Sequence, residues 1–284
     1  MSNLVTVVGE NTHMLPHMLK HYEDMVEKIY VCVYRQGEDD GILEEIEELG
    51  ITPYKVYTEE KYNWNKVTEI YNTVTATKPN DWWIVADDDE LQVYPIPLDR
   101  VIRHCDEHGI NFIRGGFLDR IGPNGTFPKV TRDTNIHEAF PLAGFFRYPM
   151  SGACPNKITL KKGGQKITSG QHYAQFDDGT NSWGPDTYKF IHESGTGTPI
   201  PLVQVHHFKW DSTCIERIKK VAEVKKEHSY SEEYQIMYDA IKDSNWKIDI
   251  ENKKYLVEEL KELSYIDYND YPHWEQLISK IIKV

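Results

Sequence analysis

The sequence predicts an α/β fold, with a mostly parallel sheet, flanking helices and a C-terminal helical segment. Two observations support this class. The first ninety residues alternate apolar, β-branched runs with apolar residues at helical spacing, and the fourth run ends abruptly in four acids. Strands and helices in this order indicate parallel strands joined by right-handed crossovers. A chain of 284 residues suits one large domain at 1–225 and a helical appendage at 226–284.

The elements before the acids follow one another closely. Helices are expected from apolar stripes that begin near residues 15, 42 and 67, and Gly50 suits the end of the second one because glycine readily adopts a left-handed conformation. No glycine-rich phosphate loop follows the first strand, since Gly9-Glu10-Asn11 lacks the G-x-G-x-x-G spacing. The four expected strands cover residues 4–8, 29–34, 51–57 and 82–86.

The signals after the acids are less regular. Residues 121–204 are rich in Gly, Pro, Asn and Thr, which indicates irregular or antiparallel structure on the substrate side of a cleft. A helix is expected to start at Thr213, which forms a capping box with Glu216. The other expected elements are a turn at 94–97, a short helix around 101–105, a strand at 110–118 and a strand at 202–205.

The composition is that of a globular protein, with 39% hydrophobic and 27% charged residues. A net charge of −13 argues against nucleic acid and anionic membrane as main partners, because both attract basic surfaces. The four cysteines are widely spaced and form no metal-binding pattern. No apolar stretch approaches the roughly 20 residues of a transmembrane helix, and the first residues resemble no secretory signal. A cytoplasmic location is therefore expected, in a bacterium or in a host cell infected by a virus.

The most informative segment is the acid run Asp87-Asp88-Asp89-Glu90, which directly follows the apolar run at 82–86. In open α/β sheets, ligands bind at the carboxyl ends of the strands. Along an extended chain Asp87 and Asp89 would share one face, and two carboxylates on one side suit a divalent cation. The alternative is a solvated loop, or the start of a turn at Asp89 or Glu90.

The order of these motifs resembles that of GT-A-type glycosyltransferases, which have a Rossmann-like fold. The likeness is to family-2-like bacterial and viral enzymes with a D-x-D-E signature, and it covers residues 1–225. The acid run at 87–90 stands in the place of that signature. The segment 115–125, which contains Asp119-Arg120, resembles their G-x-x-x-D-R…D/N-G segment, and His207-Phe208 resembles their late His-Tyr/Phe element.

The resemblance implies a hexosyl- or deoxyhexosyltransferase that uses Mn²⁺ or Mg²⁺. The donor would be a nucleotide-diphosphate sugar, with UDP favoured, and the acceptor a hydroxyl group of a glycan or another molecule. A bound cation would stabilise the negative charge on the departing diphosphate. Asp89 is the first candidate for metal contact, together with Asp87 and His207. His172 is a competing ligand, His207 could instead be a core histidine, and His206 would point the other way in a structural role.

The nucleotide is expected to lie across the ends of the first two strands. Arg35 could reach a phosphate or stack on the base. Tyr62 and its neighbour Trp64 could contact the ligand, or could equally form a cluster that caps the sheet. The candidate contacts are Val8, Gly9, Glu10, Tyr34, Arg35, Tyr62, Lys66, Asp87 and Asp88.

An inverting transfer needs a carboxylate that takes the proton of the acceptor hydroxyl. Asp119 is the first candidate because it follows the strand at 110–118; a salt bridge with Arg120 or a turn role is the alternative. Asp178, with its neighbour Asp177, is in reserve, and a retaining mechanism stays open. Two other functions remain: a nucleotidyltransferase acting on a sugar phosphate, which usually has a glycine-rich basic loop, and a carbohydrate-binding protein without catalysis.

Overall fold

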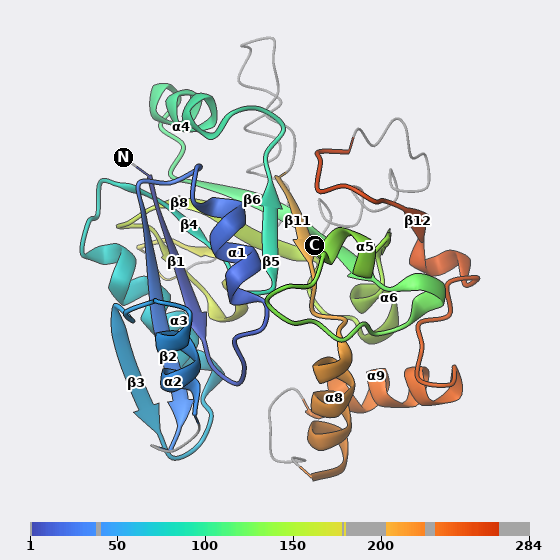
Figure 1. The fold of residues 1–284 in the computed structure, drawn as a ribbon. Helices are drawn as coiled ribbons and strands as arrows, with labels where there is room; N and C mark the ends of the chain where they lie inside the picture. The colour runs from blue at the N-terminus through green and yellow to red at the C-terminus, as the bar shows by residue number, and fades with distance from the viewer. Residues whose placement is uncertain (1, 38–40, 178, 180–202, 225–230, 267–284) are drawn as a thin grey trace. The chain divides into compact units, whose positions relative to one another are not determined.

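The computed structural model of the chain describes residues 2–37, 41–177, 179, 203–224 and 231–266 (Figure 1). They belong to two compact units. Among the described residues, the first unit comprises 2–37, 41–116, 156–177, 179 and 203–205, and the second comprises 117–155, 206–224 and 231–266. No helix in these ranges is long and apolar enough to cross a bilayer.

The first unit contains the parallel strands that the sequence predicts, in the order β4-β1-β2-β3. Three helices connect them in the expected βαβ order, so the α/β class is confirmed. The third strand begins at Lys55 and not at residue 51, since Pro53 has no N–H to donate to a ladder. The elements are β1 (Ser2–Val8), α1 (Leu15–Tyr22), β2 (Lys28–Gln36), α2 (Ile42–Glu48), β3 (Lys55–Glu59), α3 (Trp64–Ala76) and β4 (Trp82–Val85).

The core of this unit lies between the sheet and α3. The side chains of Ile70, Tyr71 and Val74 on α3 pack with apolar residues of β1, β2 and β4. The helix starts where Asn63 caps it, because the Asn63 side chain accepts a hydrogen bond from the N–H of Asn65. Six of the seven residues of β1 are buried, as expected for a strand inside a sheet that is covered on both faces.

Antiparallel strands extend the sheet, which is therefore mixed. Strand β8 (Asn156–Lys162) pairs with β4 and with the N-terminal part of β6 (Phe112–Ile121). This strand lies in the region 121–204 that we expected to be irregular or antiparallel. The remaining elements are β5 (Glu90–Val93), α4 (Leu98–Glu107), β9 (Lys166–Ile167), a 3₁₀ turn (Ser169–Gln171) and β10 (Ala174–Gln175).

The second unit combines short strands with helices. The C-terminal part of β6 pairs with β7, which pairs with β12. Residues of α8 and α9, among them Ile218, Met237 and Ile241, form its core together with Trp210. The elements are α5 (Ile136–Ala139), β7 (Leu142–Gly144), α6 (Arg147–Ser151), the end of β11 (Val203–His207), α8 (Ser212–Val224), α9 (Ser231–Asp243) and β12 (Glu258–Glu259), with 3₁₀ turns at Pro123–Gly125 and Lys253–Tyr255.

Two expectations for the C-terminal third can be compared with this unit. Asp211, and not Thr213, caps α8, because the Asp211 carboxylate accepts hydrogen bonds from the N–H of Cys214 (3.0 Å) and the hydroxyl of Thr213 (2.7 Å). The segment predicted to be a helical appendage from residue 226 contributes α9 and the short strand β12 to the second unit. Residues 267–284 lie outside the described residues.

Candidate functional site

The acid run forms a tight turn between β4 and β5. The N–H of Glu90 donates to the carbonyl oxygen of Asp87 (3.0 Å), and the Glu90 side chain in return accepts from the N–H of Asp87 (3.1 Å). The prediction that Asp87 and Asp89 share one face of an extended segment is therefore wrong, because side chains alternate regularly only along a strand. The segment instead forms a turn, which was the alternative interpretation of the sequence.

A buried lysine on β8 holds this turn. The ammonium group of Lys157 contacts Asp87 Oδ2 at 2.8 Å and Glu90 Oε1 at 2.7 Å. On the other side of Asp87, the hydroxyl of Tyr71 donates to Oδ1 at 2.9 Å. The side chains of Lys157 and Glu90 are each only 2% exposed, so both charges depend on their pairing. Asp87 is thus held by two donors inside the first unit.

The electrostatics of the turn favour an added positive charge. Burial raises the pKa of Glu90 to about 8, and although Lys157 opposes the shift, Asp87 and Asp89 add to it. Burial lowers the pKa of Lys157, but the attraction of Asp87 and Glu90 outweighs burial and raises it overall. One lysine therefore faces two carboxylates, and a proton or a cation can relieve the surplus of negative charge.

The second unit contains another buried carboxylate, Asp119. Its Oδ1 lies 3.0 Å from Nδ1 of His207 and accepts a hydrogen bond from Nε1 of Trp210 (2.9 Å). Its Oδ2 accepts from the backbone N–H groups of Phe146 (2.9 Å) and Arg147 (3.1 Å). Burial raises the pKa of Asp119, but the hydrogen bonds and the attraction of His207 outweigh it, so the pKa is lowered overall.

These contacts describe the surroundings of Asp119, for which the sequence predicts a general-base role. The residue lies within β6 and not at its end, and Arg120 donates to the carbonyl oxygens of Phe140 and Leu260 rather than to Asp119. A general base must reach the proton that it removes, whereas Asp119 is 1% exposed and both of its oxygens accept from buried donors. Asp119 is thus a partner of His207. Asp177 is exposed, and Asp178 lies outside the described residues.

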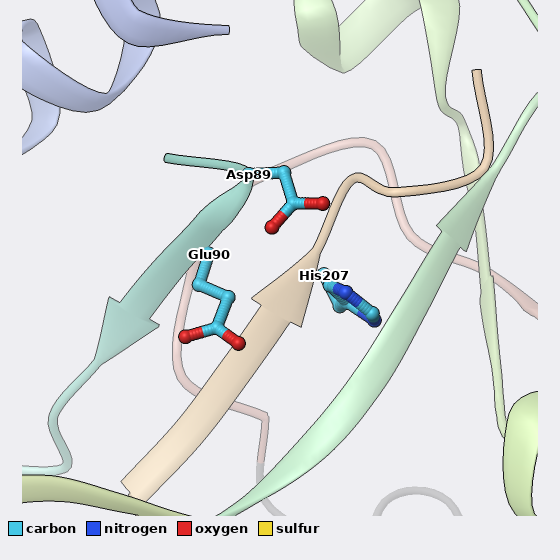
Figure 2. Close-up of side chains that lie close together, drawn as sticks. All are labelled: Asp89, Glu90 and His207. Carbon is cyan, nitrogen blue, oxygen red and sulfur yellow. The ribbon is translucent and has the colours of Figure 1, made fainter. Parts of the chain in front are cut away.

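The histidines occupy different environments. Figure 2 shows Asp89 and Glu90 where β5 begins and His207 where β11 ends. Within the second unit, Nδ1 of the buried His206 lies 3.1 Å from a guanidinium nitrogen of Arg120. In the first unit, Nδ1 of His172 lies 2.6 Å from the carbonyl oxygen of Asn156.

The residues predicted to contact the nucleotide lie near the carboxyl ends of β1 and β2. Val8 is buried and Glu10 is exposed. A Cβ atom on Gly9 would lie 3.2 Å from the carbonyl oxygen of Tyr34, so the two backbones approach closely there. The hydroxyl of Tyr34 donates to Glu59 (2.8 Å) and accepts from the N–H of Asn63 (2.8 Å). Burial raises the pKa of Tyr34 to about 12. Tyr34 therefore supports β3 and α3.

The other candidates around this edge also make contacts within the protein. The Arg35 side chain donates to the hydroxyl of Thr58 at 3.3 Å. The ring of Tyr62 packs on that of Tyr34 at 5.6 Å between centroids, as in the capping-cluster alternative. Lys66 pairs with Glu69 at 2.7 Å, and Trp64 is 39% exposed at the start of α3.

Sequence reasoning missed the residues that support the acids and the histidine. Tyr71 lies in the apolar stripe of α3, a pattern that predicts a buried residue but does not indicate a contact with Asp87. Lys157 lies in an alternating Lys-Ile-Thr-Leu-Lys segment, a pattern that indicates a strand. This pattern is the signal in the sequence that could have located Lys157. Trp210 follows the histidines by three residues, and no sequence pattern connects it to Asp119.

Comparisons with known proteins do not identify a family. No family model and no curated protein matches the chain. Among solved structures, TarS of S. aureus is 13% identical with a TM-score of 0.28, over 57% of this chain and 28% of that one. A putative nucleotide-diphospho-sugar transferase from Desulfovibrio desulfuricans G20 is 10% identical with a TM-score of 0.30, over 87% of this chain and 99% of that one. Similarity at this level assigns neither a family nor an activity.

Proposed function

We propose that the chain is a metal-dependent glycosyltransferase. It would move a hexosyl or deoxyhexosyl group from a nucleotide-diphosphate sugar, with UDP favoured, to a hydroxyl group of a glycan or another acceptor. The observation that carries the proposal is the turn of acids at the carboxyl end of β4, held by Lys157 within a parallel βαβ sheet. This edge of an α/β sheet is where ligands bind.

The donor atoms in this proposal suit a divalent cation. In the first unit, Asp89 and its neighbour Glu90 each offer a carboxylate oxygen as a metal ligand, and His207, the histidine that the sequence predicts as a ligand, would add an imidazole nitrogen. Carboxylate oxygens together with an imidazole nitrogen suit Mn²⁺ better than Mg²⁺, which takes oxygen ligands almost entirely. We propose that Asp87 stabilises the turn and does not bind the metal, because Lys157 and Tyr71 each contact one of its oxygens. When bound, the cation would stabilise negative charge on the departing diphosphate.

In this proposal Lys157 positions the acid turn, and Gly9 and Arg35 contribute to the nucleotide site. Lys157 holds Asp87 and Glu90, so the turn that carries Asp89 needs little rearrangement to accept a ligand. The nucleotide would lie across the ends of β1 and β2, where Gly9 allows the close approach of the two backbones. Arg35, at the end of β2, would supply a cation for a phosphate group.

A thermal-shift screen of UDP, GDP, CDP and dTDP, with and without Mn²⁺, tests this proposal. A ligand that binds only the native state stabilises by about 2.7 kcal/mol at a hundredfold excess over Kd. We expect one nucleotide with Mn²⁺ to raise the Tm and EDTA to reverse the gain. Asp89→Ala is expected to lose this gain and sugar transfer while keeping the Tm of the free protein. Asp99→Ala is the control, since Asp99 is an acid on α4 with a 70% exposed side chain.

The outcomes separate the functions left open by the sequence. A response to GDP or dTDP alone would change the donor and keep the class. Transfer of a nucleotidyl group to a sugar phosphate would identify a nucleotidyltransferase. The absence of a shift with every nucleotide, with and without metal, would contradict the proposal and favour a carbohydrate-binding protein.

A further inference from the structure

We propose that Asp119 is a positioning residue for His207. It holds the imidazole ring in the tautomer that carries the proton on Nδ1, so that Nε2 is the atom presented to a ligand. The inference rests on the proposed metal-dependent function, in which His207 supplies a metal ligand. Every contact that carries it lies within the second unit.

The neighbours of Asp119 identify the proton on His207. The backbone N–H groups of Phe146 and Arg147 and the indole N–H of Trp210 can only donate. These three donors occupy both oxygens of Asp119, the arrangement that suits an ionised carboxylate. Nδ1 of His207, 3.0 Å from Oδ1 of that carboxylate, must therefore be a donor as well. The lone pair of this tautomer is on Nε2.

Packing holds the ring in the same orientation. The ring centroids of His207 and Phe117 lie 4.8 Å apart at an interplanar angle of 33°, and His207 is 4% exposed. A ring that is fixed at one nitrogen and along one face has little freedom to turn. Histidines that bind metals characteristically donate their other N–H to a carboxylate, and loss of that partner weakens binding by roughly 10–100-fold.

The adjacent histidine provides an internal comparison. Nδ1 of His206 lies 3.1 Å from a guanidinium nitrogen of Arg120, and a guanidinium group can only donate. Nδ1 of His206 is therefore an acceptor, so its proton belongs on Nε2. The structure assigns opposite tautomers to two consecutive residues, and one spectrum can examine both assignments.

The first experiment reads the tautomers without any metal. A two-bond ¹H–¹⁵N correlation spectrum of the full chain, labelled with ¹⁵N-histidine, is expected to show His207 protonated on Nδ1 and His206 protonated on Nε2. His207→Gln and His206→Gln assign the two sets of signals. A His207 ring with its proton on Nε2 would overturn the inference, whatever the protein binds.

The second experiment measures the consequence for metal binding. Mn²⁺ titrations followed by electron paramagnetic resonance are expected to show roughly 10–100-fold weaker binding by Asp119→Asn than by the natural chain. Asp239→Asn is the matched control: it makes the same change at an exposed acid of α9, whose carboxylate accepts from the side chain of Gln235, so near-normal affinity is expected.

The outcomes distinguish this inference from the proposed function. Equal Mn²⁺ affinity in Asp119→Asn would overturn the positioning role and leave the metal-dependent function standing. No Mn²⁺ binding by the natural chain would overturn both. If Asp119→Asn does not fold, the tautomers of the natural chain decide the inference by themselves.

Discussion

Glu90 in the first unit and Asp119 in the second are buried carboxylates that each lie beside a basic side chain, and their pKa values are shifted in opposite directions. Glu90 lies 2.7 Å from Lys157 and its pKa is raised to about 8. Asp119 lies 3.0 Å from His207 and its pKa is lowered. Both residues are 1% exposed, so the degree of burial does not explain the difference. Asp119 has four donors on its two oxygens, whereas Glu90 shares Lys157 with Asp87 and accepts from one backbone N–H.

The number of donors thus decides which buried carboxylate stays ionised. Asp119 belongs to a satisfied network, which suits a fixed geometry. In the turn that contains Glu90, Lys157 is shared by two carboxylates and the pKa of Glu90 is raised, so Glu90 can lose its proton when a cation is added. The comparison therefore agrees with the two roles that we propose, a cation-binding turn and a network that orients His207.

Removing the shared lysine should have the largest effect. Lys157→Met leaves Asp87 and Glu90 without their cation, and we expect a loss of roughly 3–5 kcal/mol in the free energy of unfolding, measured with urea. Lys162→Met, on the same strand, is the control. Its pair with Asp106 has side chains 32% and 48% exposed, so a loss of about 0–1 kcal/mol is expected. Equal losses would show that the acid turn does not depend on Lys157.

A second buried lysine of β8 sharpens the comparison through pH. Lys161 donates to the Thr75 hydroxyl and the Gln165 carbonyl, both neutral, and burial lowers its pKa to about 7. Between this pKa and that of an unfolded lysine, the unfolded state binds more protons at Lys161, so this lysine adds stability as the pH rises, whereas the raised pKa of Glu90 acts in the opposite direction. We expect a gain of roughly 2–3 kcal/mol between about pH 6.5 and 9 from Lys161 alone, measured as the natural chain minus Lys161→Met. Urea unfolding of Lys161→Met over the same range should lack this gain; an unchanged gain would contradict the assignment.

Removing one hydrogen-bond donor from Asp119 or from Asp87 should have the smallest effects on the free energy of unfolding. Trp210→Phe takes a donor from buried Asp119 and is expected to cost about 2 kcal/mol, as for hydrogen bonds to charged groups. Tyr71→Phe removes a hydroxyl that lies 2.9 Å from both Asp87 Oδ1 and the carbonyl oxygen of Ala86 and has one proton for the two acceptors. The Asp87 side chain is 38% exposed, so water can replace this donor and about 1 kcal/mol is expected. Urea unfolding at neutral pH measures both. A larger loss in Tyr71→Phe would reverse the comparison.

The parallel half of the fold and the position of the acids could be predicted from the amino-acid sequence. The periodicity of the first ninety residues predicts four strands and three helices, and β1, β2 and β4 lie within a few residues of the expected ranges. The acid run follows β4 as expected, whereas β11 ends at His207, two residues beyond the expected strand end at 205. These features could be predicted because they depend on neighbouring residues along the chain.

The partners of the buried charged side chains became known from the three-dimensional structure and not from the sequence. Lys157 and Lys161 alternate with apolar residues along β8, a pattern that normally indicates a solvated face, yet both are buried. Asp119 resembles a catalytic acid after a strand, but its donors come from segments 27 to 91 residues away. No local pattern encodes such partners. The physical reason is that a buried charge depends on the donors that the whole fold brings around it.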